Sequence, residues 1–166
     1  ERAISHVEEL LRADPEDALA KKCAEELLSH KVLGVRAAGA LEGVYLHEGR
    51  WIDAGGMMKL QAEQLRGPKR LEAQKRLAAL TFERLGDLPK ALALYEAIVL
   101  ADPADDESRD RFRKLSAALE EFGDAARILA RVATAVREPT VKGRILAELG
   151  DVYAAQTFTI TDANNN

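Results

Sequence analysis

The stretch LAALTFERLGDLPKALALYEAIVLADP, residues 77–103, is the clearest guide to the fold. It predicts two amphipathic helices, because apolar residues recur every three or four positions on both sides of Gly86-Asp87. Glycine permits the left-handed backbone of a tight turn, and the residue before a proline disfavours the α region. Asp102-Pro103 should therefore end the second helix, and Asp14-Pro15 is the same signal near the start of the chain.

Weaker copies of this helical hairpin lie on both sides of it. Gly49, Gly86 and Gly123 are evenly spaced (86 minus 49 equals 123 minus 86), which suggests three equivalent turns. Aligning the chain on these glycines brings one large residue into register ahead of each turn: Tyr45, Phe82 and Leu119. A period of about 34 to 37 residues with two helices per unit is typical of a helical solenoid.

The predicted fold is all-α, a solenoid of helical hairpins with about nine helices. We expect a repeat domain over residues 1–156, with units at about 35–71, 72–108 and 109–142, a partial unit at 143–156, and trailing and linking helices in 1–34. Gly55-Gly56 falls inside one predicted helix, where it favours a close helix contact. The last ten residues, TFTITDANNN, alternate β-branched and polar residues, so we expect a non-repeat tail over 157–166.

Composition excludes several classes of protein. Hydrophobic residues make up 47% of the 166 residues and aromatic residues only 5%, which favours helices packed through small side chains. The net charge of −4 comes from interspersed charges, so no nucleic-acid partner is expected. Cys23 is the only cysteine, which excludes an internal disulfide and weakly favours a reducing, cytoplasmic setting. No apolar run is long enough to span a membrane, and the start without methionine suggests a fragment of a longer protein.

No pattern in the chain predicts catalysis. His6, His30 and His47 lie far apart without the spacing of metal ligands, and no phosphate-binding loop, dinucleotide fingerprint or nucleophile motif is present. We therefore expect a protein that is not an enzyme and that needs no cofactor or metal.

Two sets of residues follow a characteristic spacing: Leu146, Leu149-Gly150 and Tyr153 in the last copy, and Ala91, Tyr95 and Pro103 in the reference copy. With them the chain resembles the tetratricopeptide repeat family, because the first set matches the first-helix pattern of that family and the second set matches its second-helix pattern. The resemblance implies a right-handed solenoid, and the degenerate copies are similar to long repeat arrays of large bacterial proteins. The sequence departs from the pattern at Lys75, Ile98 and Ile128. A helical repeat of the HEAT type is the alternative, especially before residue 50.

The resemblance also implies where a partner would bind, because first helices of this family line a groove that holds peptides. Projected onto this chain, the groove residues are Arg36, Gly39, Gly43 and His47, then Ala73, Arg76, Leu80 and Glu83, then Asp110, Arg113, Ala117 and Glu120. Arg76 and Arg113 fall at the same position one unit apart, and arginine can bind carboxylates bidentately, which suggests an acidic peptide partner. The alternative is that both arginines are ordinary solvated charges.

The leading hypothesis is a scaffold that binds a protein or peptide through the surface of the solenoid. The alternatives are a structural spacer, or a regulatory segment of a larger enzyme or transcription regulator. Because stacked repeats bury apolar surface only between neighbours, the ends of the array are also expected to support self-association.

Overall fold

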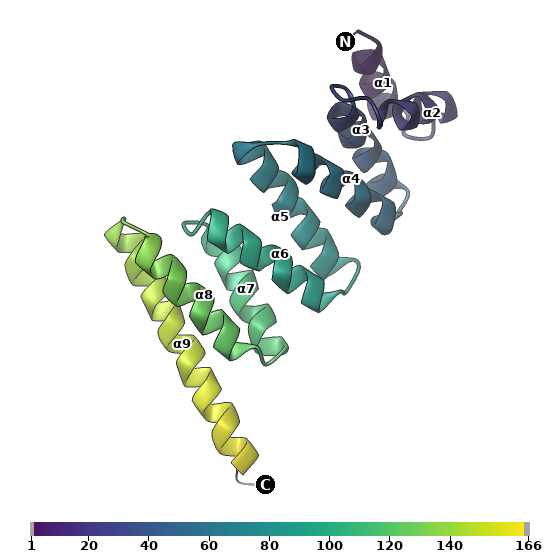
Figure 1. Ribbon diagram of the computed structural model, residues 1–166. Helices are drawn as coiled ribbons and strands as arrows, with labels where there is room; N and C mark the ends of the chain where they lie inside the picture. Colours follow the sequence, from purple (N-terminus) through teal and green to yellow (C-terminus); the bar gives the residue numbers. More distant parts are fainter. Residues whose placement is uncertain (1, 165–166) are drawn as a thin grey trace. The chain divides into compact units, whose positions relative to one another are not determined.

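The computed structural model describes residues 2–164, including the side chains of residues 2–157. Across residues 2–164 the chain forms nine α-helices and no β-strand, which confirms the predicted all-α class (Figure 1). The helices are α1 (Arg2–Ala13), α2 (Ala18–Leu27), α3 (Gly34–His47), α4 (Trp51–Gln64), α5 (Gly67–Glu83), α6 (Leu88–Ala101), α7 (Asp106–Ala118), α8 (Phe122–Ala135) and α9 (Pro139–Asn164).

Helices α1 to α5 form one compact unit, which ends at Gly86. Each helix packs on helices one or two places away in the chain: α3 contacts α1, α2 and α4, and α4 also contacts α5 (Figure 1). The close contact expected at Gly55-Gly56 is found at Gly55 only: a Cβ there would lie 3.3 Å from Leu80 Cδ2 and 3.7 Å from Leu77 Cδ1, whereas a Cβ on Gly56 would meet no atom within 4 Å. Glycine at position 55 therefore lets α4 approach α5 without a bend.

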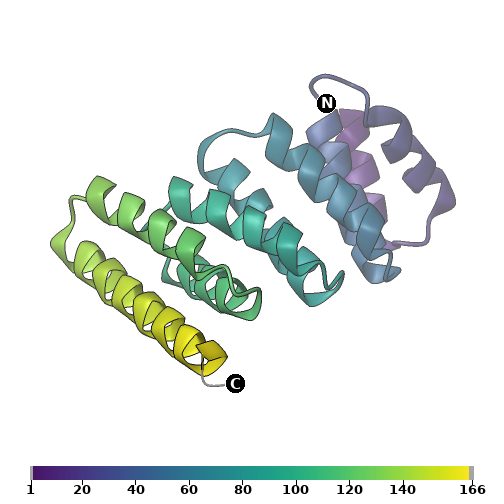
Figure 2. The ribbon, with the colours of Figure 1, turned by 60° about the horizontal axis from the view of Figure 1, so that its bottom comes forward.

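Helices α6 to α9 form the second unit, which starts at Asp87. Here α6 contacts α7 and α8, and α9 contacts α7 and α8 (Figure 2). Residues 77–103 are therefore divided between the units, with α5 packing on α4 and α6 packing on α7. The helix α9 continues to Asn164, so residues 157–164 of the expected non-repeat tail are helical despite their alternation of β-branched and polar residues; residues 165 and 166 lie outside the described residues.

The helices begin and end at residues with a clear physical role. The side chain of Asp17 accepts hydrogen bonds from the N–H groups of Leu19 and Ala20, both at 2.9 Å, which caps α2. Asp87 caps α6 in the same way through Lys90 N–H at 3.1 Å. At the other ends, α1 and α6 stop directly before the Asp-Pro pairs, as the sequence predicts.

The turn after α7 differs from the predicted one. Gly49 and Gly86 have the expected left-handed backbone, with φ of 69° and 64°, but Gly123 lies inside α8. The left-handed residue of this turn is Glu120, with φ of 58°, which precedes Gly123 in the sequence. The step from Gly86 to the next turn is therefore shorter than the step from Gly49 to Gly86, and the predicted equal spacing is wrong.

The buried residues of the even-numbered helices repeat with the same spacing as the turns. Each buried position of α4 recurs in α6 after the interval that separates Gly49 from Gly86. Each of these positions recurs again in α8 after the shorter interval that separates Gly86 from Glu120. The three sets are Ala54, Gly55, Met58, Gln61 and Ala62; Ala91, Leu92, Tyr95, Ile98 and Val99; and Ala125, Ala126, Leu129, Val132 and Ala133. A common pattern of buried positions thus runs through three helices despite their low similarity in sequence.

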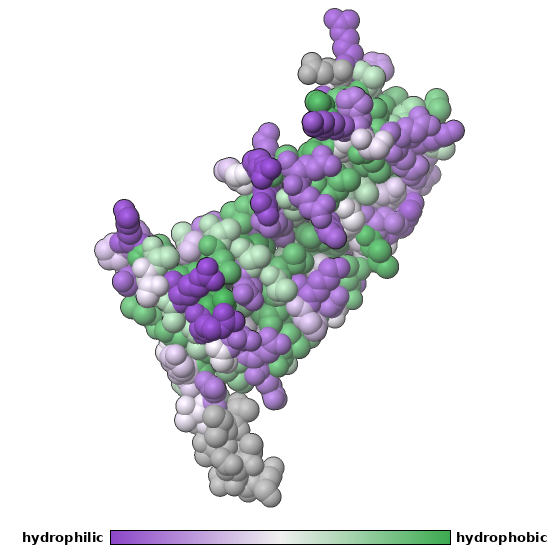
Figure 3. Space-filling view, viewed as in Figure 1, coloured by the Kyte–Doolittle hydropathy of each residue, from purple (hydrophilic) through white to green (hydrophobic). Residues whose placement is uncertain are grey.

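On the side drawn in Figure 3, hydrophilic side chains are interspersed with apolar ones along the helices. Among the described residues, no helix combines the length and apolar character needed to cross a bilayer.

Substitutions in the turns test the revised spacing. Glu120→Gly should raise the free energy of unfolding by about 1 kcal/mol, because glycine adopts a positive φ without the steric cost of a Cβ. Gly86→Ala should lower it by about 1 kcal/mol for the same reason. Gly123→Ala is the control: it should leave stability unchanged or raise it, since a Cβ there meets open space. Urea unfolding measures all three, and a loss of stability in Gly123→Ala would contradict the revised turn.

Candidate functional site

The twelve predicted groove residues lie on three helices and in one turn of the described chain. Their positions on the elements are Arg36, Gly39, Gly43 and His47 on α3; Ala73, Arg76, Leu80 and Glu83 on α5; Asp110, Arg113 and Ala117 on α7; and Glu120 in the turn after α7. Ala73 and Leu80 are buried and belong to the core, and Leu80 lies close to Gly55, so the prediction of both as groove-surface residues is wrong. Glu120 is exposed but serves the turn.

Arg76 is held by carboxylate and amide groups of its own unit. Its Nε donates to Glu42 Oε1 at 2.9 Å, and its Nη2 donates to Glu42 Oε2 at 3.2 Å and to Gln61 Oε1 at 3.1 Å. Gln61 Nε2 in turn donates to Glu42 Oε2 at 2.6 Å. Glu42 and Gln61 are buried, and the side chain of Arg76 is 36% exposed. This network joins α3, α4 and α5, so the carboxylate that Arg76 binds is one of the chain's own.

Arg36 makes the equivalent link between α3 and α1. Its Nε donates to Glu8 Oε1 at 2.9 Å, its Nη2 forms an ion pair with the second oxygen of Glu8, and Nη2 also donates to Ser5 Oγ at 3.0 Å. The buried residues Ile4, Val7 and Leu11 of α1 recur in α3 as Ala38, Leu41 and Tyr45, and the same interval relates Glu8 to Glu42. Glu8 of α1 and Glu42 of α3 thus occupy the same position on their helices. Each binds an arginine of the next odd-numbered helix, Arg36 of α3 and Arg76 of α5 respectively.

In the second unit, arginines of α7 bind carboxylates of α9. Arg109 is completely buried and donates from Nε to Glu148 Oε2 at 2.9 Å, with further bonds to Asp106 and to the carbonyl of Pro103. Burial alone would lower the pKa of Arg109, but the hydrogen bonds to Glu148 and Asp106 outweigh it and raise that pKa. Arg113 pairs with Asp151 at 3.3 Å.

Arg76 and Arg113 do not occupy the same repeat position. The buried residues of α5 recur in α7 in the same order and with the same spacing: Ala73, Leu77, Leu80 and Thr81 correspond to Ser108, Phe112, Leu115 and Ser116. This register aligns Arg76 with Arg111. The predicted pair of equivalent arginines is therefore wrong, because it depended on the position of Gly123.

Asp110 lines a small pocket of about 240 Å³ among α7, α8 and α9, which Arg113, Asp151 and Val152 also line. The hydrogen bond from Lys114 Nζ, at 2.6 Å, is the main cause that lowers the pKa of Asp110, and the charges of Lys114 and Arg113 add to it. The acidic and basic groups of this pocket are thus paired with one another.

A larger pocket of about 500 Å³ lies between α1 and α3, inside the first unit. All four positions of α3 that were predicted to face the groove line it: Arg36, Gly39, Gly43 and His47. The other side of the pocket is formed by Glu8, Leu11 and Arg12 of α1 and by Pro15, which follows α1; none of these was predicted as a binding residue. The signal that could have identified α1 is the repeat relation between Glu8 and Glu42.

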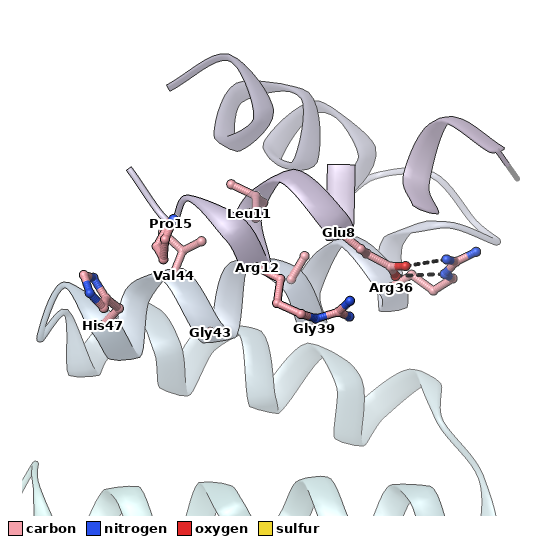
Figure 4. Close-up of a pocket in the computed structure, with 10 residues that line it drawn as sticks. Glu8, Leu11, Arg12, Pro15, Arg36, Gly39, Gly43, Val44 and His47 are labelled. Atoms are coloured by element: carbon pink, nitrogen blue, oxygen red, sulfur yellow. Dashed lines mark hydrogen bonds and ion pairs between the residues drawn. The ribbon is translucent and has the colours of Figure 1, made fainter. Parts of the chain in front are cut away.

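The residues of this pocket follow α3 from one end to the other (Figure 4). His47 lies beside Pro15 at one end, the Glu8–Arg36 ion pair lies at the other, and the side chain of Arg12 extends over α3 towards Gly39. Leu11 and Val44 are buried and provide an apolar floor. The pocket therefore combines basic side chains, an apolar base and two positions without a side chain.

The described part of the chain contains no cluster of metal-ligand side chains. No group of three histidine, cysteine, aspartate or glutamate side chains there could hold a metal ion. Cys23 is partly buried on α2.

Comparison of the chain with protein-family models, with curated proteins and with solved structures finds no match.

The ion-pair network of Arg76 predicts a loss of stability on substitution. Arg76→Met should lower the free energy of unfolding by about 2 kcal/mol, because Glu42 would remain buried without its cation. The double variant Glu42→Leu with Arg76→Met should recover at least half of this loss. Arg127→Met is the control, since its pair with Asp124 is more than half exposed and should contribute less than about 1 kcal/mol. Equal effects of Arg76→Met and Arg127→Met in urea unfolding would contradict a structural role for the network.

Proposed function

We propose that the chain is a tetratricopeptide-like array of helical hairpins that binds a protein or peptide partner through its odd-numbered helices. The observation that carries this proposal is the recurrence of the same buried positions in α4, α6 and α8, in step with the turns. Such a period, with two helices per unit, is typical of solenoid repeats. Packing between helices one or two places apart also supports it, because solenoid units contact mainly their neighbours.

Binding rather than catalysis is supported by the character of the pocket between α1 and α3. It is open to solvent, is lined by two adjacent odd-numbered helices, and holds basic groups beside an apolar floor. Peptide-binding surfaces combine such apolar contacts with a few polar groups that orient the ligand. The residues that line the pocket, all of them described, lack the paired nucleophile and base, or the pair of carboxylates, that hydrolytic reactions need.

A structural spacer is the second candidate, and the ion pairs between odd-numbered helices favour it. Arg36, Arg76, Arg109 and Arg113 each bind a carboxylate of another odd-numbered helix. These arginines hold the hairpins together, so their positive charges are largely neutralised within the chain.

Selection from a library of random peptides distinguishes the two candidates. A binding module should enrich peptides over an unrelated helical protein, and the bound peptides should slow amide hydrogen exchange in the odd-numbered helices. Exchange followed by mass spectrometry locates the protected segments. No enrichment, or protection confined to the even-numbered helices, would favour the spacer.

A further inference from the structure

The pocket between α1 and α3 contains two basic groups that the described residues do not neutralise. Arg12 and His47 both line it and are both exposed, and neither has a hydrogen bond or ion pair with another described residue. The only carboxylate that lines the pocket in the described chain is Glu8, and both of its oxygens bind Arg36. Arg12 therefore gives the pocket a local positive charge in a chain whose net charge is −4, and the imidazole ring of His47 adds an N–H group that can donate to a carboxylate.

The wall of the pocket on α3 leaves room for a ligand. Gly39 and Gly43 lie one turn apart, and both are exposed. A Cβ on Gly43 would meet no atom within 4 Å, so packing in the protein does not require glycine there. An exposed glycine within a helix costs about 1 kcal/mol relative to alanine. Without side chains at these positions, an extended chain can approach the backbone of α3 closely.

The dimensions of the pocket suit a short peptide. From Arg36 to His47, α3 rises by about 16 Å, which corresponds to about five residues of extended chain. Arg12 reaches over the middle of this path, and His47 lies at one end (Figure 4). The apolar floor of Leu11 and Val44 lies between the two helices.

We propose that this pocket binds an acidic peptide segment of a partner protein, whose carboxylates pair with Arg12 and His47 while its backbone lies along Gly39 and Gly43. This inference rests on the proposed function and assigns both a site and a ligand chemistry to it. The arginine that recognises the ligand is thus Arg12, which has no partner among the described residues, and not Arg76 or Arg113, which bind carboxylates of the chain. An apolar side chain of the peptide would contact Leu11 and Val44.

Fluorescence anisotropy with two labelled peptides tests the ligand chemistry. One peptide, about nine residues long so that it exceeds the pocket, alternates glutamate and leucine; the other has glutamine in place of glutamate. The full chain should bind the acidic peptide about tenfold more tightly, because each charge-assisted bond adds more than a neutral one. Equal binding of the two peptides, or tighter binding of a single-stranded oligonucleotide, would overturn the proposal.

Charge variants test the basic groups. Arg12→Gln should weaken binding of the acidic peptide about tenfold, and the double variant with His47→Gln should abolish the preference over the glutamine peptide. Arg137→Gln is the matched control, since Arg137 is exposed, lies outside the pocket and has no partner among the described residues. If Arg137→Gln weakens binding as much as Arg12→Gln does, recognition is a general charge effect and the site is refuted.

A steric variant tests the position of the ligand independently of charge. Gly43→Leu should fill the pocket and prevent binding of both peptides, while its melting temperature stays equal or rises because leucine favours the helix. Gly56→Leu is the control, because Gly56 is equally open but lies on α4 outside the pocket. Peptide binding that survives Gly43→Leu would refute this pocket and leave the proposed function intact. Failure of both the labelled peptides and the random library would refute the two together.

Discussion

Close packing of helices through small side chains is the constraint on which the rest of the structure depends. The buried positions include many alanines, among them Ala37, Ala38, Ala54, Ala91 and Ala125. Alanine allows helix backbones to approach but buries little apolar area, so each contact contributes modestly to stability. Directional bonds between neighbouring helices therefore matter more here than in a core of large side chains. The buried Glu42–Gln61–Arg76 network and the buried Arg109 provide such bonds.

The sequence predicted the class of fold, the ends of α1 and α6 and the turns at Gly49 and Gly86 because these depend on local chemistry. Asp-Pro pairs and apolar periodicity act within a few residues. The turn after α7 was placed wrongly because a left-handed residue need not be glycine. Glu120 adopts that conformation, and Glu121 N–H donates to the carbonyl of Ser116 at 2.8 Å, as Arg50 N–H does to Tyr45 in the turn at Gly49. This hydrogen bond offsets the steric cost of the Cβ, and composition alone does not reveal it.

The wrong position of the turn after α7 also caused an error in the predicted binding site. A small shift in the register between α5 and α7 aligned Arg76 with Arg113 instead of Arg111. The identity of the arginines could be predicted, but not their partners, because those lie on other helices and far away in the sequence. On α3, by contrast, the helix spacing alone brought Arg36, Gly39, Gly43 and His47 to one pocket, since no turn separates these residues.

Open glycines alone do not mark a binding site in this chain. Gly56, Gly143 and Gly150 are helical and as uncrowded as Gly43, yet none of them lines the pocket between α1 and α3. What distinguishes Gly43 is that the space above it lies beside two basic groups without a counterion among the described residues. A spacer gains stability from alanine at position 43 and from a carboxylate beside Arg12. The chain has neither alanine at position 43 nor, among the described residues, a carboxylate paired with Arg12. A ligand that brings its own carboxylates accounts for both absences more simply than the needs of the fold do.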